Sequence, residues 1–177
     1  MIGYFEMDDL KEIIRSIPDF PKKGILFRDI TTLLQNGRQF RRAIDTLAEH
    51  FQGKKIDKIV AVESRGFIIA SPLAYKLNAG FIPVRKKGKL PYRTVEATYD
   101  LEYGTDTLQM HADAFQPGAN ILIVDDLLAT GGTAKATIDL VEKLKGKVVG
   151  ICFLIELTDL KGREKLKGYK VLSIIKY

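Results

Sequence analysis

Residues 121–136 read Ile-Leu-Ile-Val-Asp-Asp-Leu-Leu-Ala-Thr-Gly-Gly-Thr-Ala-Lys-Ala, an apolar run that passes through two acids into a glycine-rich turn. Four consecutive apolar β-formers at 121–124 predict a strand that is buried on both faces. Apolar residues then recur at helical spacing over residues 133–145, which predicts a helix. The turn therefore lies at the carboxyl end of a strand, where parallel α/β sheets bind their ligands.

The turn has the chemistry of an anion site. Backbone N–H groups at a helix start point outward with a positive dipole, and two adjacent glycines let a ligand approach the backbone closely. The threonines on either side of the glycines add hydroxyl donors. Asp125 and Asp126 precede the turn closely enough for one ligand to contact both the turn and the acids, and their carboxylates can accept hydrogen bonds from hydroxyl groups. The stretch thus predicts a ligand with both a phosphate and hydroxyls, and a ribose 5-phosphate meets both requirements.

The rest of the chain alternates between strand and helix patterns. Further strands are predicted at residues 56–62, 80–84, 95–103, 106–111, 148–155 and 171–175. Further helices are predicted from Asp8 or Asp9 to Ile17, over residues 40–51 and over residues 67–77. This order predicts an α/β fold, a mostly parallel twisted sheet flanked by helices on both faces. Residues 1–177 contain no repeat or linker, so we expect a single domain.

Composition narrows the class of protein. The chain is 46% apolar and 28% charged, which is ordinary for a globular domain. No apolar run approaches the ~18 residues that span a bilayer, and residues 1–10 lack the basic start of a signal peptide, so we expect no membrane partner. The single cysteine, Cys152, lies in an apolar run, and we expect it to be buried in a cytoplasmic protein. His50 and His111 lack companion ligands, so we expect no zinc site.

The net charge of +6 predicts an anionic partner. Five basic residues gather in one segment of loop-like composition, namely Arg85, Lys86, Lys87, Lys89 and Arg93. The sequence contains no Arg-rich recognition helix and no pair of stacking aromatics, so we do not expect nucleic acid as the partner.

A second loop follows the predicted strand at 56–62. Both loops should open at the same edge of the sheet, because each follows a parallel strand. The Ser64 hydroxyl, the Arg65 guanidinium and the main chain near Gly66 could hold a pyrophosphate. Taken alone, this tetrapeptide, which begins at Glu63, fits a surface turn equally well. Its expected position beside the first loop favours a role in ligand binding over a surface turn.

Residues 85–104 form a long polar segment between two predicted strands. Connecting segments of this length in compact domains are often lids over an active site. A basic lid would neutralise charge on a departing pyrophosphate and would exclude water. A solvated hairpin with incidental lysines is the alternative.

The order of strand, Asp-Asp pair, Thr-Gly-Gly-Thr loop and helix resembles the 5-phosphoribosyl-1-pyrophosphate (PRPP) signature of the type I phosphoribosyltransferases. It matches neither a P-loop nor the dinucleotide-binding fingerprint. The resemblance to the adenine-specific members extends over essentially the whole chain, through residues 24–30, 85–91, 101–104, 155–158 and 161–164. It implies the type I fold with a small N-terminal hood at 1–35, which binds the base, and a flexible β-hairpin lid at 85–104.

The resemblance also implies an activity. A purine salvage enzyme of this kind transfers the phosphoribosyl group of PRPP to adenine and releases AMP and pyrophosphate. It implies Mg²⁺ as cofactor, held mainly by substrate oxygens and water. It further implies a homodimer.

The resemblance assigns roles to individual residues. Those implied for catalysis are Glu102, as proton acceptor or donor at purine N7, Asp125 and Asp126. Those implied to bind the 5-phosphate and ribose are Asp125, Asp126, Ala129, Thr130, Gly131, Gly132 and Thr133. Those implied to bind pyrophosphate are Glu63, Ser64, Arg65, Arg85, Lys86 and Lys89, with a cis peptide between Glu63 and Ser64. Those implied to bind adenine are Leu26, Phe27, Arg28 and Leu157.

Two alternatives remain open at this point. The chain could prefer a 6-oxopurine such as xanthine, although residues 26–28 argue for adenine. It could instead be a regulator that binds a phosphoribosyl ligand or RNA without catalysis. The acid at Glu102, the Arg65 loop and the complete lid favour an enzyme.

Overall fold

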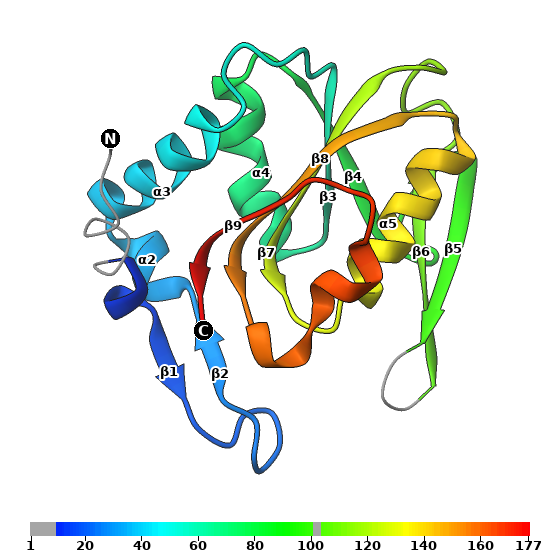
Figure 1. Cartoon of the computed structure of the whole chain (residues 1–177). Helices are drawn as coiled ribbons and strands as arrows, with labels where there is room; N and C mark the ends of the chain where they lie inside the picture. Colours follow the sequence, from blue (N-terminus) through cyan, green and yellow to red (C-terminus); the bar gives the residue numbers. More distant parts are fainter. Residues whose placement is uncertain (1–9, 101–103) are drawn as a thin grey trace.

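A seven-stranded sheet runs through the centre of the computed structural model, which describes residues 10–100 and 104–177 (Figure 1). Its strands are β3 (Lys58–Val62), β4 (Gly80–Lys86), β5 (Thr94–Asp100), β6 (Thr105–His111), β7 (Asn120–Leu128), β8 (Lys147–Glu156) and β9 (Val171–Lys176). The spatial order is β5-β6-β4-β3-β7-β8-β9. Strands β4, β3, β7, β8 and β9 are parallel, and β6 and β5 extend the sheet antiparallel. The predicted α/β fold class is confirmed.

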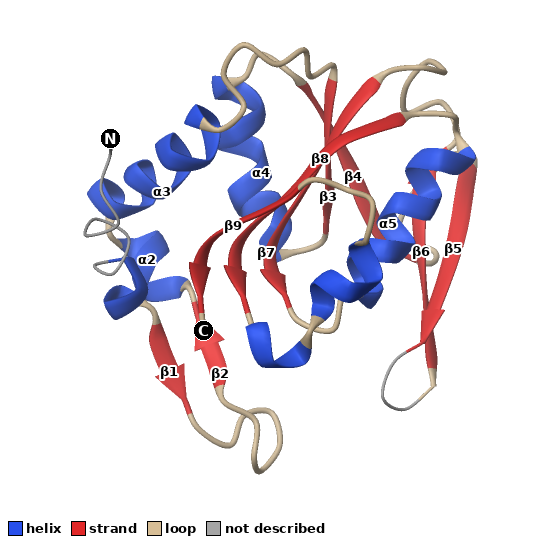
Figure 2. Cartoon of the chain, in the orientation of Figure 1, coloured by secondary structure: helices blue, strands red, loops and turns tan. Residues whose placement is uncertain are grey.

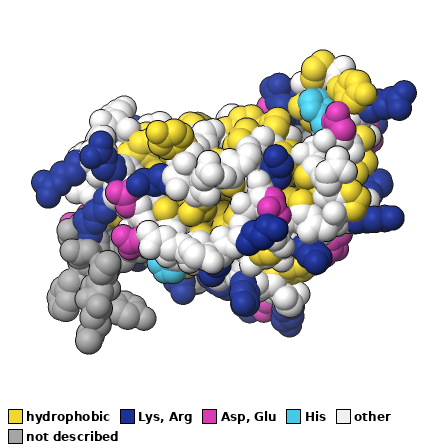
Figure 3. Space-filling view, turned by 90° about the horizontal axis from the view of Figure 1, so that it is seen from above, with side chains coloured by type: hydrophobic (Ala, Val, Ile, Leu, Met, Phe, Trp, Pro, Cys, Tyr) yellow, Lys and Arg dark blue, Asp and Glu magenta, His cyan; other side chains and the backbone are white. Residues whose placement is uncertain are grey.

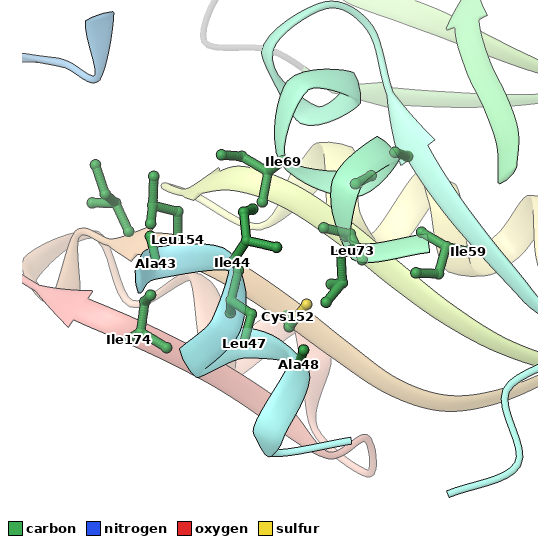
Figure 4. Packing of buried hydrophobic residues seen from close by; sticks show 14 of the residues in the cluster. Ala43, Ile44, Leu47, Ala48, Ile59, Ile69, Leu73, Cys152, Leu154 and Ile174 are labelled. Atoms are coloured by element: carbon green, nitrogen blue, oxygen red, sulfur yellow. The ribbon is translucent and has the colours of Figure 1, made fainter. Parts of the chain in front are cut away.

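Helices cover both faces of this sheet. Helices α3 (Gly37–Glu49) and α4 (Arg65–Lys76) pack on one face, and α5 (Gly132–Lys143) and the 3₁₀ segment η2 (Gly162–Leu166) pack on the other. Side chains alternate along β3, so Ile59 faces the first cluster and Val60 faces the second. Figure 4 shows α3 directing Ile44 and Leu47 toward the sheet, close to Cys152. Cys152 is fully buried, as predicted.

The predicted helix at residues 40–51 is confirmed as α3, which begins slightly earlier and ends at Glu49. The Asn36 side chain caps it by accepting a hydrogen bond from the Gln39 N–H at 3.2 Å. Its inward stripe includes Ala43 and Leu47, both with no exposed surface. The 3.6-residue periodicity was a sufficient signal here, because one face of the helix is covered throughout.

The predicted N-terminal helix is wrong beyond residue 13. Residues 10–13 are helical, but β1 (Arg15–Ile17) is a strand that pairs antiparallel with β2 (Phe27–Asp29). The Arg15 guanidinium binds the Asp29 carboxylate through Nε at 3.0 Å and Nη2 at 2.6 Å, so a partner distant in sequence overrides local helical periodicity. The expected caps, Asp8 and Asp9, lie outside the described residues. This hairpin projects from the side of the sheet (Figure 2), and the short helix α2 (Thr31–Gln35) follows it.

The strand predicted at 121–124 continues to Leu128, so the two acids lie within β7 and not in the turn after it. The reason is the neighbouring strand. Strand β8 continues to Glu156, and the ladder pairs Asp125 with Phe153 and Leu128 with Glu156. Backbone pairing therefore holds the acids in extended conformation and moves the turn to residues 129–131.

All parallel strands end at the same edge of the sheet, the lower edge in Figure 1, where the two predicted loops lie. Figure 3 views the molecule from the opposite edge, where Lys and Arg side chains are spread around the surface. Within the described part of the chain, no helix combines the length and the apolar character needed to cross a membrane. Parallel α/β sheets bind ligands at the edge where their strands end.

Candidate active site

A cleft of about 400 Å³ opens at the edge where the parallel strands end. Residues 62–65 and 125–134 supply most of its lining, and the rest comes from Lys86 of β4, Tyr99 of β5, Leu108 of β6 and Phe153 of β8. This volume is typical of small-molecule sites. The structure therefore brings together the two loops that the sequence placed at one sheet edge.

Residues 129–133 form a tight loop between β7 and α5. Gly131 adopts φ of 79°, a left-handed conformation that favours glycine, and α5 begins at the next residue. The first N–H groups of a helix have no partner inside the helix, so they are available to an anion in the cleft. The back of the loop lies against η2, because a Cβ on Gly131 would lie 2.5 Å from the Gly162 carbonyl oxygen. Sequence periodicity gave no sign of this support from Gly162.

The two acids of β7 are held by the start of α4. Arg65 Nε lies 2.9 Å from Asp126 Oδ2, and the Asp126 N–H donates to Asp125 Oδ1 at 2.9 Å. Gly66 permits this approach, since a Cβ there would lie 2.6 Å from Asp125 Oδ1. The two carboxyl groups therefore face the cleft from fixed positions.

Burial raises the pKa of Asp125 well above the usual carboxyl range, and the charge of Asp126 raises it further. Burial also raises the pKa of Asp126, although the Arg65 guanidinium opposes that shift. A pair of enclosed carboxylates gains from any ligand that donates hydrogen bonds or carries positive charge. Ribose hydroxyls and a cationic sugar both satisfy this requirement.

The peptide bond between Glu63 and Ser64 is cis, as the resemblance implied. The Glu63 carboxylate accepts hydrogen bonds from Arg85 Nε at 3.1 Å and Nη2 at 3.0 Å, from the Lys86 backbone N–H at 2.8 Å and from Lys89 Nζ at 3.3 Å. Burial alone would raise the pKa of Glu63, but these hydrogen bonds lower it overall. Ser64 and Lys86 line the cleft, whereas Arg85 and Lys89 are engaged with Glu63.

The segment implied to bind adenine lies beside the cleft and is joined to it by Arg65. The Arg65 guanidinium carbon lies 5.2 Å from the ring centre of Phe27, so this side chain contacts both Phe27 and Asp126. Phe20 packs edge to face on Phe27 with ring centres 5.1 Å apart. Leu26 is 47% exposed. The base segment thus presents one aromatic ring toward the cleft and leaves an apolar neighbour in solvent.

Arg28 and Leu157 lie on the same side of the molecule. The Arg28 guanidinium carbon lies 3.6 Å from the centre of the Tyr177 ring. Leu157 directly follows β8, and its N–H donates to the Leu128 carbonyl at 2.9 Å, just before the loop at residues 129–133. The backbone at Leu157 is therefore tied to the strand that carries the acids.

Glu102 lies outside the described residues. The hairpin that leads to it is described, and Val95, Ala97 and Tyr99 of β5 pack against the cluster around α5. The Tyr99 ring comes close to the loop at residues 129–133, since a Cβ on Gly132 would lie 3.3 Å from it. Sequence reasoning missed Tyr99 as a lining residue, although the period-2 alternation of these three apolar residues marks one face of the strand.

Known proteins resemble this chain over most of its length. The family described as phosphoribosyl transferase domain matches residues 29–176. A relative from Brachyspira hyodysenteriae named adenine phosphoribosyltransferase is 64% identical over 96% of this chain and 99% of its own. The crystal structure of adenine phosphoribosyltransferase from Thermoanaerobacter pseudethanolicus has a TM-score of 0.94 at 54% identity, covering 97% of this chain and 99% of that one.

A further solved structure contains ligands. Adenine phosphoribosyltransferase from Saccharomyces cerevisiae, complexed with adenine and an imino-altritol bisphosphate, has a TM-score of 0.91 at 42% identity, covering 97% of this chain and 99% of that one.

Proposed function

The chain belongs to the phosphoribosyl transferase domain family, and on that premise we propose that it transfers the phosphoribosyl group of PRPP to adenine, giving AMP and pyrophosphate. One observation carries the proposal. A single cleft joins an anion-binding loop to an acid pair, of which Asp126 is buried and Asp125 half-buried, and Arg65 links that pair to the aromatic ring of the base segment. The names of the relatives support adenine as the base.

The phosphate loop and the acids hold the sugar. In the proposed reaction, N–H groups of residues 129–133 bind the 5-phosphate, and Asp125 and Asp126 accept hydrogen bonds from the ribose hydroxyls. Adenine attacks the anomeric carbon while the bond to pyrophosphate breaks, so positive charge develops on the sugar ring. The acids stabilise this charge because Asp126 is buried and Asp125 is half-buried, so water screens them less than it screens surface carboxylates.

Pyrophosphate leaves toward the cis peptide loop. Ser64, Arg65 and Lys86 line that side of the cleft and offer donors to phosphate oxygens. Arg85 and Lys89 neutralise Glu63, which would otherwise repel the leaving group. In this proposal these two cations act on pyrophosphate partly by cancelling the charge of an adjacent carboxylate.

Adenine stacks on Phe27 and is covered on its other face by Leu157, and the main chain at Leu26 and Arg28 reads its edge. Arg65 lies over the Phe27 ring in the structure, so it must give way as the base stacks. Base choice rests on hydrogen bonds, because a site built for a 6-amino group leaves its acceptor unpaired with a 6-oxopurine. Sites of this kind discriminate by roughly 10⁴ to 10⁵.

Glu102 is proposed to exchange a proton with purine N7 when the tip of the hairpin approaches the base. A positioned carboxyl at that atom contributes roughly 10² to 10⁴ in rate.

The cleft suits Mg²⁺ as a cofactor. Within the described residues there is no group of three or more His, Cys, Asp and Glu side chains that could hold a metal. The protein offers Mg²⁺ only the carboxylate oxygens of Asp125 and Asp126 as one pair of acids, so most ligands of the ion would come from PRPP and water. Mg²⁺ bound there with PRPP would supply positive charge beside the pyrophosphate group.

The setting of the enzyme is also part of the proposal. We expect a cytoplasmic homodimer in which Arg85 lies near the subunit interface. The single cysteine, Cys152, is buried, which suits a reducing compartment. Sedimentation of the purified chain at several concentrations tests the dimer.

The first test is a base panel. Purified protein is mixed with PRPP and Mg²⁺ and, separately, with adenine, hypoxanthine, guanine or xanthine, and nucleotide and pyrophosphate are measured. We expect AMP from adenine and less than about 10⁻⁴ of that kcat/KM with the other bases. Turnover of a 6-oxopurine overturns the base assignment. No turnover, combined with ligand or salt-sensitive RNA binding, supports the regulator.

A further inference from the structure

Tyr177 bonds the backbone on both sides of Leu157. Its N–H donates to the Glu156 carbonyl at 3.0 Å, and its carbonyl accepts from the Thr158 N–H at 2.9 Å and from the Thr158 hydroxyl at 2.6 Å. These bonds use only main-chain atoms of Tyr177. They therefore persist when its side chain is changed.

The side chain of Tyr177 points to the N-terminal hood. Its ring lies 3.6 Å from the Arg28 guanidinium carbon and 4.7 Å from Lys11 Nζ, and its hydroxyl donates to the Lys11 carbonyl at 3.0 Å. The guanidinium of Arg28 also donates to the Ser16 hydroxyl of β1, so the ring contacts a residue already fixed within the hairpin. Arg28 directly follows Phe27 in β2.

We infer that Tyr177 is a positioning residue that sets the separation between Phe27 and Leu157, and so the width of the adenine slot. The inference rests on the proposed function, which assigns the two faces of the base to these residues. The backbone of Tyr177 is bonded to the residues next to Leu157, and its ring is stacked on the residue next to Phe27. One residue thus connects both walls of the slot, and its connection to the hood is made by its side chain, chiefly by the ring.

The chemistry of these contacts sets the size of the effect. A guanidinium on an aromatic face is an attractive contact that an aliphatic side chain cannot replace. Loss of one such contact changes a binding constant by roughly 3- to 30-fold. The loss should fall on ligands that carry the base and should spare those that occupy only the sugar and phosphate positions.

Three variants separate the roles. Tyr177→Leu keeps an apolar side chain against the core but removes the ring, and Tyr177→Phe keeps the ring but removes the hydroxyl. Tyr169→Leu is the matched control, because Tyr169 also packs partly on a core cluster and its hydroxyl also bonds a distant residue, Glu142. Titration calorimetry measures the Kd of AMP and of ribose 5-phosphate for each protein, and steady-state kinetics give KM for adenine and for PRPP.

We expect Tyr177→Leu to weaken AMP binding and to raise the KM for adenine by roughly 3- to 30-fold, with ribose 5-phosphate binding and the KM for PRPP within about twofold of the parent. Tyr177→Phe should stay closer to the parent, and Tyr169→Leu should leave the ratio of the two dissociation constants unchanged. Unaltered AMP binding in Tyr177→Leu, or equal weakening of both ligands, overturns the inference. A parent that binds both ligands but makes no AMP refutes the proposed function alone, and a parent that binds neither refutes both.

Discussion

Replacement of Gly162 by alanine tests whether η2 supports the phosphate loop. A Cβ at this position would lie 2.2 Å from the Ala129 carbonyl oxygen and 2.9 Å from a methyl carbon of Leu128. Real Cβ atoms essentially never come within 3.0 Å of another atom, so the loop or η2 must move by about 0.8 Å, the difference between the two distances. The backbone of the loop is the nearest neighbour, and it cannot rotate away as a flexible side chain would.

The expected cost follows from this displacement. Misplacement of a bound group by about 1 Å can lower a rate by roughly 100-fold, so we expect kcat/KM for PRPP in Gly162→Ala to fall by about 10- to 100-fold, or ~1.4 to 2.7 kcal/mol. The KM for adenine should change by less than about threefold, because the strain lies at the 5-phosphate end. Overpacking should also cost about 1–3 kcal/mol of stability, which lowers Tm by roughly 2–12 °C for a chain of this length. Initial rates, measured well below Tm with each substrate varied in turn, show whether the loss falls on PRPP or on adenine.

Gly146→Ala is the matched control. Its Cβ would lie 2.8 Å from side-chain atoms of Phe115 and Val141, so it introduces a milder crowding, against side chains and not backbone, after α5 and away from the cleft. This control should lower Tm and leave both KM values near those of the parent. The reasoning is refuted when Gly162→Ala retains the parental KM for PRPP, or when Gly146→Ala loses as much activity.

Four other changes have expected outcomes. The double change Asp125→Asn and Asp126→Asn should lower kcat by roughly 100-fold or more with circular dichroism unchanged, and near-normal kcat/KM would refute the ribose assignment. Because the folded-state pKa of Asp125 is raised, the parent should gain stability as pH falls through that pKa and the carboxylate is protonated. Asp125→Asn alone removes the ionised carboxylate, so it should raise Tm at pH 7 and raise it less at lower pH. Hydrogen bonds from Arg163 lower the pKa of Glu156 despite burial, so the stability that they add should be present above the unfolded pKa near 4.5 and lost as pH falls through the folded pKa. Arg163→Met should lower the free energy of unfolding, measured in urea at pH 7, by about 2–3 kcal/mol. This loss is smaller than for a fully buried pair because Arg163 is partly exposed. Glu102→Leu should lower kcat by roughly 10²- to 10⁴-fold with little change in KM, and an effect on KM alone would move Glu102 from chemistry to binding.

The features that could be predicted are those decided by neighbouring residues. The apolar run at 121–124, the glycine turn and the periodic stripe after it predicted β7, the phosphate loop and α5, because each pattern has a local cause. The placement of Glu63 and Ser64 beside that loop followed from the rule that parallel strands end at one edge.

The features that could not be predicted are made by residues far apart in the chain. Residues 15–17 continue a helical stripe in sequence, yet pairing with β2 makes them a strand. The contact of Gly162 with the phosphate loop and that of Tyr177 with Arg28 join segments about 30 and 150 positions apart, which no period of 2 or 3.6 can reveal. The fold class depends on patterns along the chain, whereas the supports of the site depend on where separate segments meet.

The cations that face the cleft already have carboxylate partners, which changes how substrate binding should be understood. Arg65 pairs with Asp126 at 2.9 Å and Lys86 Nζ pairs with Asp106 at 2.9 Å, so an incoming polyphosphate exchanges partners and does not meet free cations. Arg65 differs from Lys86 because it also lies over Phe27. Ribose hydroxyls replace it at Asp126, adenine replaces it at Phe27, and both exchanges leave the guanidinium to the phosphates. Binding of the sugar and of the base should therefore reinforce each other through Arg65. Removal of its guanidinium should abolish this coupling and weaken PRPP binding, whereas loss of the Lys86 ammonium should weaken PRPP binding and leave the coupling intact.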